Sequence, residues 1–159
     1  MFSAIHKWVR FDDSDLGRPK MAGSKEKVST LAEPMCLLSL VHEMEDAGIV
    51  IAEDLDEIRK WCVTEICKHE QRNASRILEN VSNEGQELKG TNGRLMNPGH
   101  AIECGWFLIK EADRAKDQAL KQKAIDQFIL NPIEYGADKE HGGIFYFLDA
   151  DGNRVINQN

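Results

Sequence analysis

The dipeptide Asn97-Pro98 determines where the longest helix predicted for this chain begins. Asparagine is a preferred helix N-cap, and proline suits the first helical position, where a missing N–H costs nothing. Apolar residues then recur at three- and four-residue steps, which is the period of an amphipathic helix. The sequence therefore predicts a helix over residues 98–115, with an apolar stripe made of Ile102, Trp106, Ile109 and Ala112.

Two polar residues lie at the start of this predicted helix. His100 falls in the first turn, where free backbone N–H groups and the positive end of the helix dipole are exposed. Glu103 follows three residues later, on the same helix face. A helix dipole lowers the pKa of a histidine and a carboxylate neighbour raises it, so a histidine held between them can exchange protons near neutral pH. The pair is a candidate for general acid/base catalysis.

The same spacing also fits other roles. A lone histidine and glutamate at a helix start are most often a capping interaction or solvated surface residues. Glu-x-x-His pairs bind metals in helical bundles, but they come in sets, and the sequence contains no second set, so we predict no metal. Cys104 is an alternative nucleophile, although it points to a different helix face from Glu103. The four cysteines lack zinc-ligand spacing and are expected to be free thiols, mostly buried.

The rest of the chain predicts further helices joined by small hairpins. The helices are expected over residues 34–47, 54–70 and 117–130, with Asn131-Pro132 ending the last one. A hairpin turn is expected at residues 83–85, and a strand over residues 144–148 leads into a turn at 149–152. No Gly-rich phosphate loop and no strand–helix alternation occur. The sequence predicts a mainly α fold of paired helices, with residues 1–159 forming a single segment.

Charge and composition limit the functions that are open to the chain. Hydrophobic residues make up 42% and charged residues 30% of the sequence, which is typical of a globular protein. The net charge of −7 argues against a nucleic-acid-binding surface, which needs a basic footprint. No apolar run approaches the ~20 residues of a membrane helix, and the first residues do not resemble a signal peptide. We therefore expect a cytoplasmic protein with neither nucleic acid nor membrane as a partner.

Five stretches of the sequence, at residues 15–19, 33–38, 76–90, 97–108 and 138–152, resemble the N-acylglucosamine 2-epimerase family, whose mammalian member is also called renin-binding protein. The most specific is NPGHAIECGWFL at residues 97–108. The other four segments follow the family order. Chains of this family are well over twice as long, so the sequence resembles the middle of such an enzyme.

The resemblance implies a fold and a reaction. The fold would be part of an (α/α)6 barrel, and the reaction would interconvert N-acetylglucosamine and N-acetylmannosamine at C2. Two acid/base groups would act on opposite faces of a planar intermediate. His100 matches one of the family's two histidines and Glu103 its supporting glutamate, whereas the second histidine would lie beyond Asn159. Arg94, in the loop before the helix, is placed to reach a sugar hydroxyl or Glu103, although it can equally be a solvated loop residue.

The resemblance implies no cofactor for the chemistry and allows ATP or another nucleotide as an activator. It also allows a homodimer and an amino sugar as the small-molecule partner. The role of His141 stays open. The alternative function is that of an inactive fragment that binds a sugar, a nucleotide or a protein such as renin. Related families share the barrel, so a free sugar remains an alternative to the N-acyl hexosamine.

Overall fold

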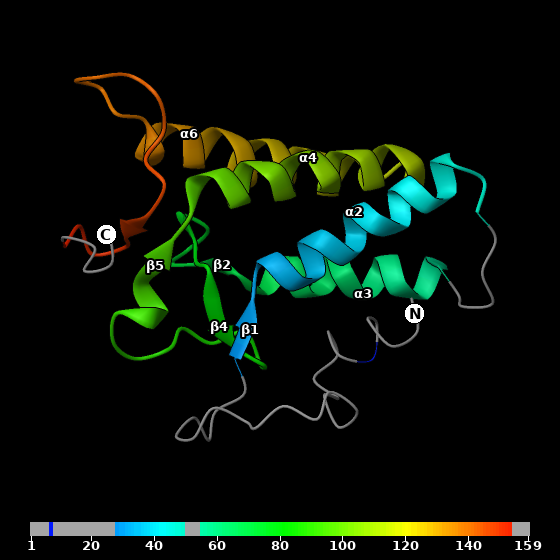
Figure 1. The fold of residues 1–159 in the computed structure, drawn as a ribbon, viewed down its shortest axis with the longest axis horizontal. Coiled ribbons are helices and arrows are strands. Elements are labelled where there is room, and N and C mark those ends of the chain that lie inside the picture. Colours follow the sequence, from blue (N-terminus) through cyan, green and yellow to red (C-terminus); the bar gives the residue numbers. More distant parts are fainter. Residues whose placement is uncertain (1–6, 8–27, 50–54, 154–159) are drawn as a thin grey trace.

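The computed structural model describes Lys7 and residues 28–49 and 55–153, and Figure 1 shows their arrangement. The helices are α2 (Ala32–Asp46), α3 (Leu55–Lys68), α4 (Pro98–Ala115), α5 (Gln118–Lys123), the π-helical segment η2 (Ala124–Leu130), α6 (Asn131–Gly136) and the 3-10 turn η1 (Asn92–Arg94). The short strands are β1 (Val28–Thr30), β2 (Glu70–Gln71), β3 (Arg76–Ile77), β4 (Asn80–Ser82), β5 (Leu95–Met96) and β6 (Leu148–Asp149). The fold is therefore mainly helical, as predicted. The segment at residues 15–19 lies outside the described residues.

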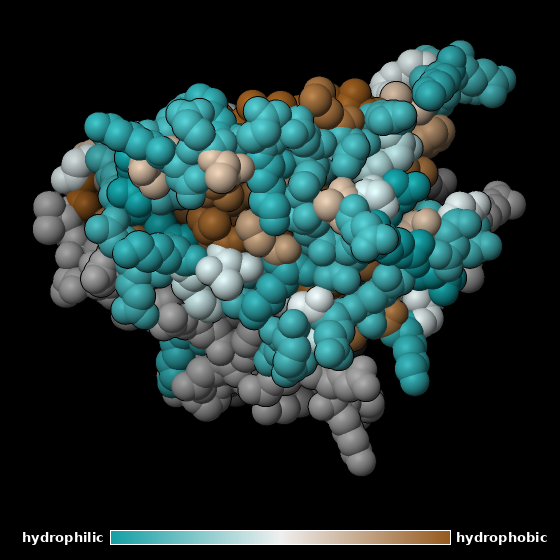
Figure 2. Space-filling model, turned by 180° about the vertical axis from the view of Figure 1, so that it is seen from behind, coloured by the Kyte–Doolittle hydropathy of each residue, from teal (hydrophilic) through white to brown (hydrophobic). Residues whose placement is uncertain are grey.

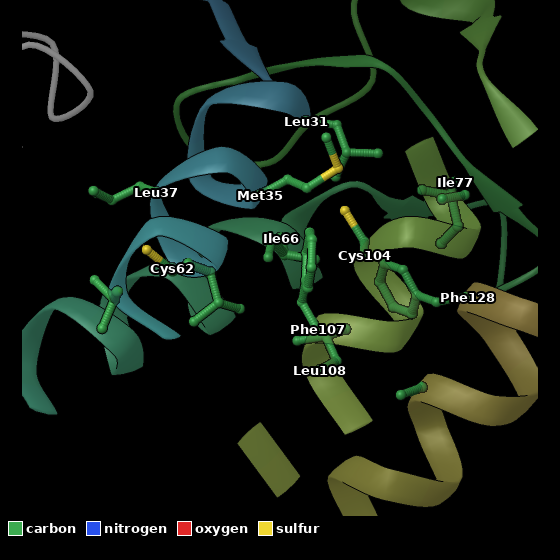
Figure 3. Close-up of a cluster of buried hydrophobic side chains, with 14 of the residues drawn as sticks. Leu31, Met35, Leu37, Cys62, Ile66, Ile77, Cys104, Phe107, Leu108 and Phe128 are labelled. Atoms are coloured by element: carbon green, nitrogen blue, oxygen red, sulfur yellow. The ribbon is translucent and has the colours of Figure 1, made fainter. Parts of the chain in front are cut away.

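The long helices are arranged as neighbouring pairs. Helix α2 packs against α3, while α4 packs against the continuous run of α5, η2 and α6. Contacts between α2 and α4 join the two pairs, and Figure 3 shows side chains from these helices meeting in one core. The largest fully buried side chains include Phe128, Leu31, Leu37, Leu38, Ile58, Ile66, Ile77 and Leu108. This packing places the start of α4 beside the small strands (Figure 1).

Helix α4 begins and ends where the sequence predicts, at Pro98 and Ala115, but its buried face differs from the predicted stripe. Trp106 is 63% exposed and stacks on Phe107, with ring centroids 5.4 Å apart. The buried face consists of Ala101, Cys104, Gly105, Phe107, Leu108, Glu111 and Ala112. Gly105 explains why this face of α4 is buried, because it lets the α4 backbone lie against Phe128 and Ile129 of η2. A Cβ atom at this position would lie 2.6 Å from Ile129 Cγ1.

The prediction that Asn131-Pro132 ends the last helix was wrong. Helical structure continues through α6 to Gly136, with Pro132 in its first turn. Proline in a helix interior normally clashes with the carbonyl four residues earlier. Here the residue four positions earlier is Phe128, which lies in the π-helical segment η2, and Pro132 lies in the first turn of α6. The chain therefore passes the proline without leaving its helical course.

The strands form three antiparallel pairs. Strand β1 pairs with β4, with Thr30 opposite Asn80, and β2 pairs with β3. Strand β5 pairs with β6, so that Leu95 lies opposite Asp149. The predicted turn at residues 83–85 is confirmed by the Gly85 N–H, which donates to the Ser82 carbonyl at 2.9 Å, with Gly85 at φ +79°. Together the pairs form a cap of irregular strands at the start of α4.

None of the described helices combines the length and the apolar composition that a membrane span requires.

Candidate active site at the start of helix α4

The first turn of α4 is fixed by its own cap. The Asn97 side-chain oxygen accepts a hydrogen bond from the His100 backbone N–H at 3.1 Å, and Pro98 occupies a buried position in the first turn. The His100 side chain is 30% exposed. Its imidazole is therefore attached to a rigid helix start and still reaches the surface.

The partner of the His100 ring is Glu79. Nδ1 of His100 lies 3.0 and 3.1 Å from the two carboxylate oxygens of Glu79. The Glu79 side chain is 11% exposed, and its burial raises the pKa of the carboxyl, an effect that the nearby His100 opposes. Nδ1 can donate to this carboxylate, which leaves Nε2 as the ring nitrogen able to take up a proton. No hydrogen bond to Nε2 is seen within the described residues.

Sequence spacing predicted Glu103, not Glu79, as the residue that holds the His100 ring. Glu103 is exposed on α4, and the contact seen for the ring is the one with Glu79, 21 residues earlier in the chain. Glu103 lies near α2 instead, where its charge adds to desolvation in raising the pKa of the Cys36 thiol. Cys36 is itself exposed, unlike the buried thiol that the sequence predicted. Glu103 is thus an open carboxylate one turn beyond His100.

A signal for Glu79 does exist in the sequence. In the run of residues 77–81, Ile77, Leu78 and Val81 are apolar and Glu79 is the one charged member, which is the pattern of a segment that the structure buries throughout. A carboxylate is rarely buried without a partner. The run itself predicts that a partner exists, but the partner's identity requires the tertiary structure.

The backbone of Glu79 ties the surrounding segments together. Its N–H donates to the Leu95 carbonyl at 2.8 Å, and its carbonyl accepts from the Leu31 N–H at 2.9 Å. The neighbouring Leu78 carbonyl accepts from Nδ1 of the buried His69 at 2.8 Å. The segment before β4 is therefore fixed to the start of α2, to the end of α3 and to β5, which leads directly into α4.

Arg94 is engaged with the turn after β6. Its Nε lies 3.2 and 3.1 Å from the two carboxylate oxygens of Asp149 and 3.2 Å from Asp151. Among the described residues, Arg94 forms ion pairs with Asp149 and Asp151, and none with Glu103 is seen. Arg94 and the desolvated Asp149 together hold β5 against β6, and the ion pair contributes to the lowered pKa of Asp149.

The two other candidates from the sequence are Cys104 and His141. Burial, together with the Glu79 charge, raises the pKa of the Cys104 thiol well above its ordinary value, so the thiolate needed for nucleophilic attack is disfavoured. His141 is exposed in the loop after α6 and lies 3.4 Å from Asp138. The described residues contain no cluster of three or more histidine, cysteine or acidic side chains arranged to bind a metal ion.

The geometry suits proton transfer. A histidine with one ring nitrogen bound to a buried carboxylate and the other available is arranged as a general acid/base. An open carboxylate follows on the same helix, and the helix start supplies a positive dipole. The site can therefore remove and return a proton on a bound molecule.

Comparisons with known proteins identify the family of the chain. The family model described as N-acylglucosamine 2-epimerase (GlcNAc 2-epimerase) matches residues 41–159. The chain is 47% identical over 152 residues to the N-acylglucosamine 2-epimerase of Bos taurus, covering 96% of this chain and 36% of the bovine one. It is 44% identical to that of Homo sapiens, covering 95% and 35% of the two chains. The chain thus spans about a third of the length of these relatives.

A solved structure supports the fold. The crystal structure of a D-mannose isomerase superimposes with a TM-score of 0.64 and 17% identity, covering 79% of this chain and 34% of that one. That structure is a barrel of the (α/α)6 type, so the paired helices described above form part of such a barrel. The matches in sequence show that the chain belongs to the N-acylglucosamine 2-epimerase family.

Proposed function

We propose that this segment provides one half of the acid/base machinery of a sugar 2-epimerase that interconverts N-acetylglucosamine and N-acetylmannosamine. The observation that carries the proposal is the His100 ring, which is bound at Nδ1 by a buried carboxylate and has no hydrogen bond at Nε2 within the described residues. The names of the relatives supply the substrate class, an N-acylated glucosamine. The proposal extends to the cytoplasm as location and to a homodimer with ATP or another nucleotide as activator.

The reaction needs two proton-transfer groups. In the open-chain form of the sugar, C2 lies next to the aldehyde, so removal of its proton gives a planar enolate. Return of a proton to the opposite face inverts the centre, and therefore one group must stand on each side. We assign one side to Nε2 of His100, with Glu103 at the next turn as an additional carboxylate that faces the sugar. Arg94 is assigned a supporting role in sugar binding through the side-chain nitrogens that Asp149 and Asp151 do not engage.

The test is exchange of the C2 proton. We expect His100→Asn, in the longest natural product that contains this sequence, to slow interconversion by about 10²–10⁴-fold and to slow deuterium wash-in at C2 from the epimer whose proton His100 removes, while the circular dichroism spectrum stays the same. NMR detection of N-acetylmannosamine formation measures turnover in the same samples. Glu134→Gln, an exposed change on α6, is the matched control and should exchange at the unchanged rate. Wash-in at the normal rate from both epimers in His100→Asn would refute the assignment.

A second candidate is binding without turnover. Of the histidines in the described ranges, His42 and His69 are buried and His141 is paired with Asp138 in an exposed loop. This leaves His100 as the described histidine with the geometry for acid/base work. If the 159-residue chain binds N-acetylglucosamine in isothermal titration calorimetry and shows no C2 exchange, while the longer product exchanges, this segment alone is a binding element.

A further inference from the structure

We propose that Glu79 is the positioning residue of His100: it holds the ring with the proton on Nδ1, so that Nε2 faces the reacting carbon. This inference rests on the proposed function for its consequence in catalysis. The spacing along α4 pointed to Glu103 for this role. The structure gives the ring a different carboxylate, on another segment of the chain.

The contact itself favours one tautomer. Both carboxylate oxygens of Glu79 lie within hydrogen-bond distance of Nδ1, and an ionised carboxylate can only accept. Nδ1 must therefore carry a proton, and in the neutral ring Nε2 then carries the lone pair. When Nε2 takes the C2 proton, the ring becomes an imidazolium whose charge the Glu79 carboxylate offsets. The group on the opposite face then delivers a different proton to C2, and Nε2 passes its own proton to solvent, so the ring is neutral again and protons and charge balance over the cycle.

The position of Glu79 is fixed independently of His100. The Glu79 N–H donates to the Leu95 carbonyl, and two residues later Asn97 caps the helix on which His100 lies. The Glu79 carbonyl accepts from the Leu31 N–H at the start of α2. The Glu79 carboxylate and the His100 imidazole therefore belong to two segments that a backbone hydrogen bond holds together. A side chain held in this way loses little freedom when it orients its partner.

The other titratable groups near His100 are few. Glu103 on the same helix is exposed, and solvent screens its charge. The thiols of Cys36 and Cys104 have raised pKa values and are neutral at physiological pH. Arg94 is paired with Asp149 and Asp151. Among these groups, Glu79 is the one whose charge acts on the ring at contact distance.

The first test does not depend on catalysis. Carbethoxylation by diethylpyrocarbonate requires a neutral imidazole, so its rate at His100, followed by peptide mass spectrometry, reports protonation as pH varies. In the longest natural product that contains this sequence, we expect Glu79→Gln to move the midpoint of this profile to lower pH, because a contacting opposite charge is lost. Glu103→Gln should move it less, and the control Glu134→Gln should not move it. An unmoved midpoint in Glu79→Gln, or a larger shift in Glu103→Gln, overturns the proposal.

The second test separates positioning from substrate binding. We expect kcat for N-acetylmannosamine formation to fall at least about tenfold in Glu79→Gln, with KM little changed, because acid/base groups contribute about 10²–10⁴-fold. Glu79→Asp should restore part of kcat and the normal midpoint, since it keeps the charge. A change in KM alone would contradict positioning. If the unsubstituted protein shows no epimerase activity but the carbethoxylation midpoint still moves in Glu79→Gln, the epimerase function is rejected and the positioning role of Glu79 is kept.

Discussion

At the scale of single residues, His69 links three segments through its buried ring. Nδ1 donates to the Leu78 carbonyl at 2.8 Å, and Nε2 lies 3.4 Å from the Ser29 hydroxyl of β1. Burial lowers the pKa of His69 to about 4, with the neighbouring Lys68 charge acting in the same direction. The native state therefore holds this ring neutral, whereas an unfolded chain would protonate it below its ordinary pKa of 6.5.

Because the native state holds the His69 ring neutral, we expect the free energy of unfolding to decrease in acid. As pH falls from about 6.5 to about 4, the unfolded state binds a proton at His69 that the native state does not, so the free energy of unfolding decreases. The shift corresponds to about 3 kcal/mol over the whole window. Urea unfolding at pH 7 and pH 4.5 measures it, with His69→Gln as the comparison. The variant should be less stable at pH 7 and should lose less stability on acidification. Parallel losses in both proteins would mean that other groups cause the pH dependence.

Sequence reasoning placed His100 correctly in the first turn of α4 and missed the carboxylate that contacts its ring. His100 was recognisable because Asn97, Pro98 and the helix period fix its place in a first turn. Glu79 was not, because its contact with His100 joins two segments that local rules treat separately. Arg94 was assigned by its position before the helix, yet its ion partners Asp149 and Asp151 come 55 and more residues later.

At the scale of elements, the contact between α4 and η2 depends on one glycine. A Cβ on Gly105 would lie 2.6 Å from Ile129 Cγ1 and 3.1 Å from the Phe128 carbonyl carbon. Overpacking of this kind costs about 1–3 kcal/mol, more than the roughly 1 kcal/mol that alanine gains over glycine in a helix interior. The two helical segments therefore approach as closely as their backbones permit.

We accordingly expect Gly105→Ala to lower the free energy of unfolding by up to about 2 kcal/mol, although alanine is the better helix former. Chemical denaturation of the single variant measures the loss. In an Ile129→Ala background the same change should cost less, because the nearest atom is gone. A stabilised Gly105→Ala protein would show that the helices can separate without penalty.

Helix existence was predictable, whereas helix type and strand pairing were not. The cap at Asn97 and the left-handed Lys116 bracket α4, and a periodic apolar pattern lies between them. The π-helical segment η2 has the same apolar residues as an α-helix would have, so its wider turns leave no local signature. Strand β1 is only three residues long, and it is a strand because it pairs with β4.

At the scale of the whole molecule, apolar side chains remain on the surface of α4, η2, α6 and the following loop. Figure 2 shows apolar surface along the upper edge of the molecule, the edge at which α4 and α6 lie in Figure 1. The exposed large residues of these segments are Trp106, Leu130, Ile133, Ile144, Phe145 and Tyr146. Large exposed apolar patches favour association.

The isolated 159-residue chain is therefore expected to be helical, to self-associate and to lack epimerase turnover. Sedimentation velocity at several concentrations tests the association, and binding of a dye to exposed apolar surface should accompany it. The double change Leu130→Gln with Ile133→Gln should reduce the association, whereas Leu40→Gln on α2 should leave it unchanged. A stable monomer with a sharp melt and measurable turnover would contradict this expectation.

The pairing of β5 with β6 also sets the order in which the site can form during synthesis. Leu95 lies opposite Asp149, and Arg94 is held by the same turn, so the strand leading into α4 gains its partner late. At about 5–20 residues per second, a ribosome adds the intervening stretch several seconds after His100 has been made. During that interval the helix can form, since its contacts are local, but Arg94 lacks its ion partners Asp149 and Asp151. A nascent chain released before Asp149 should therefore hold the histidine on a formed helix whose approach strand is bonded to Glu79 and still lacks β6.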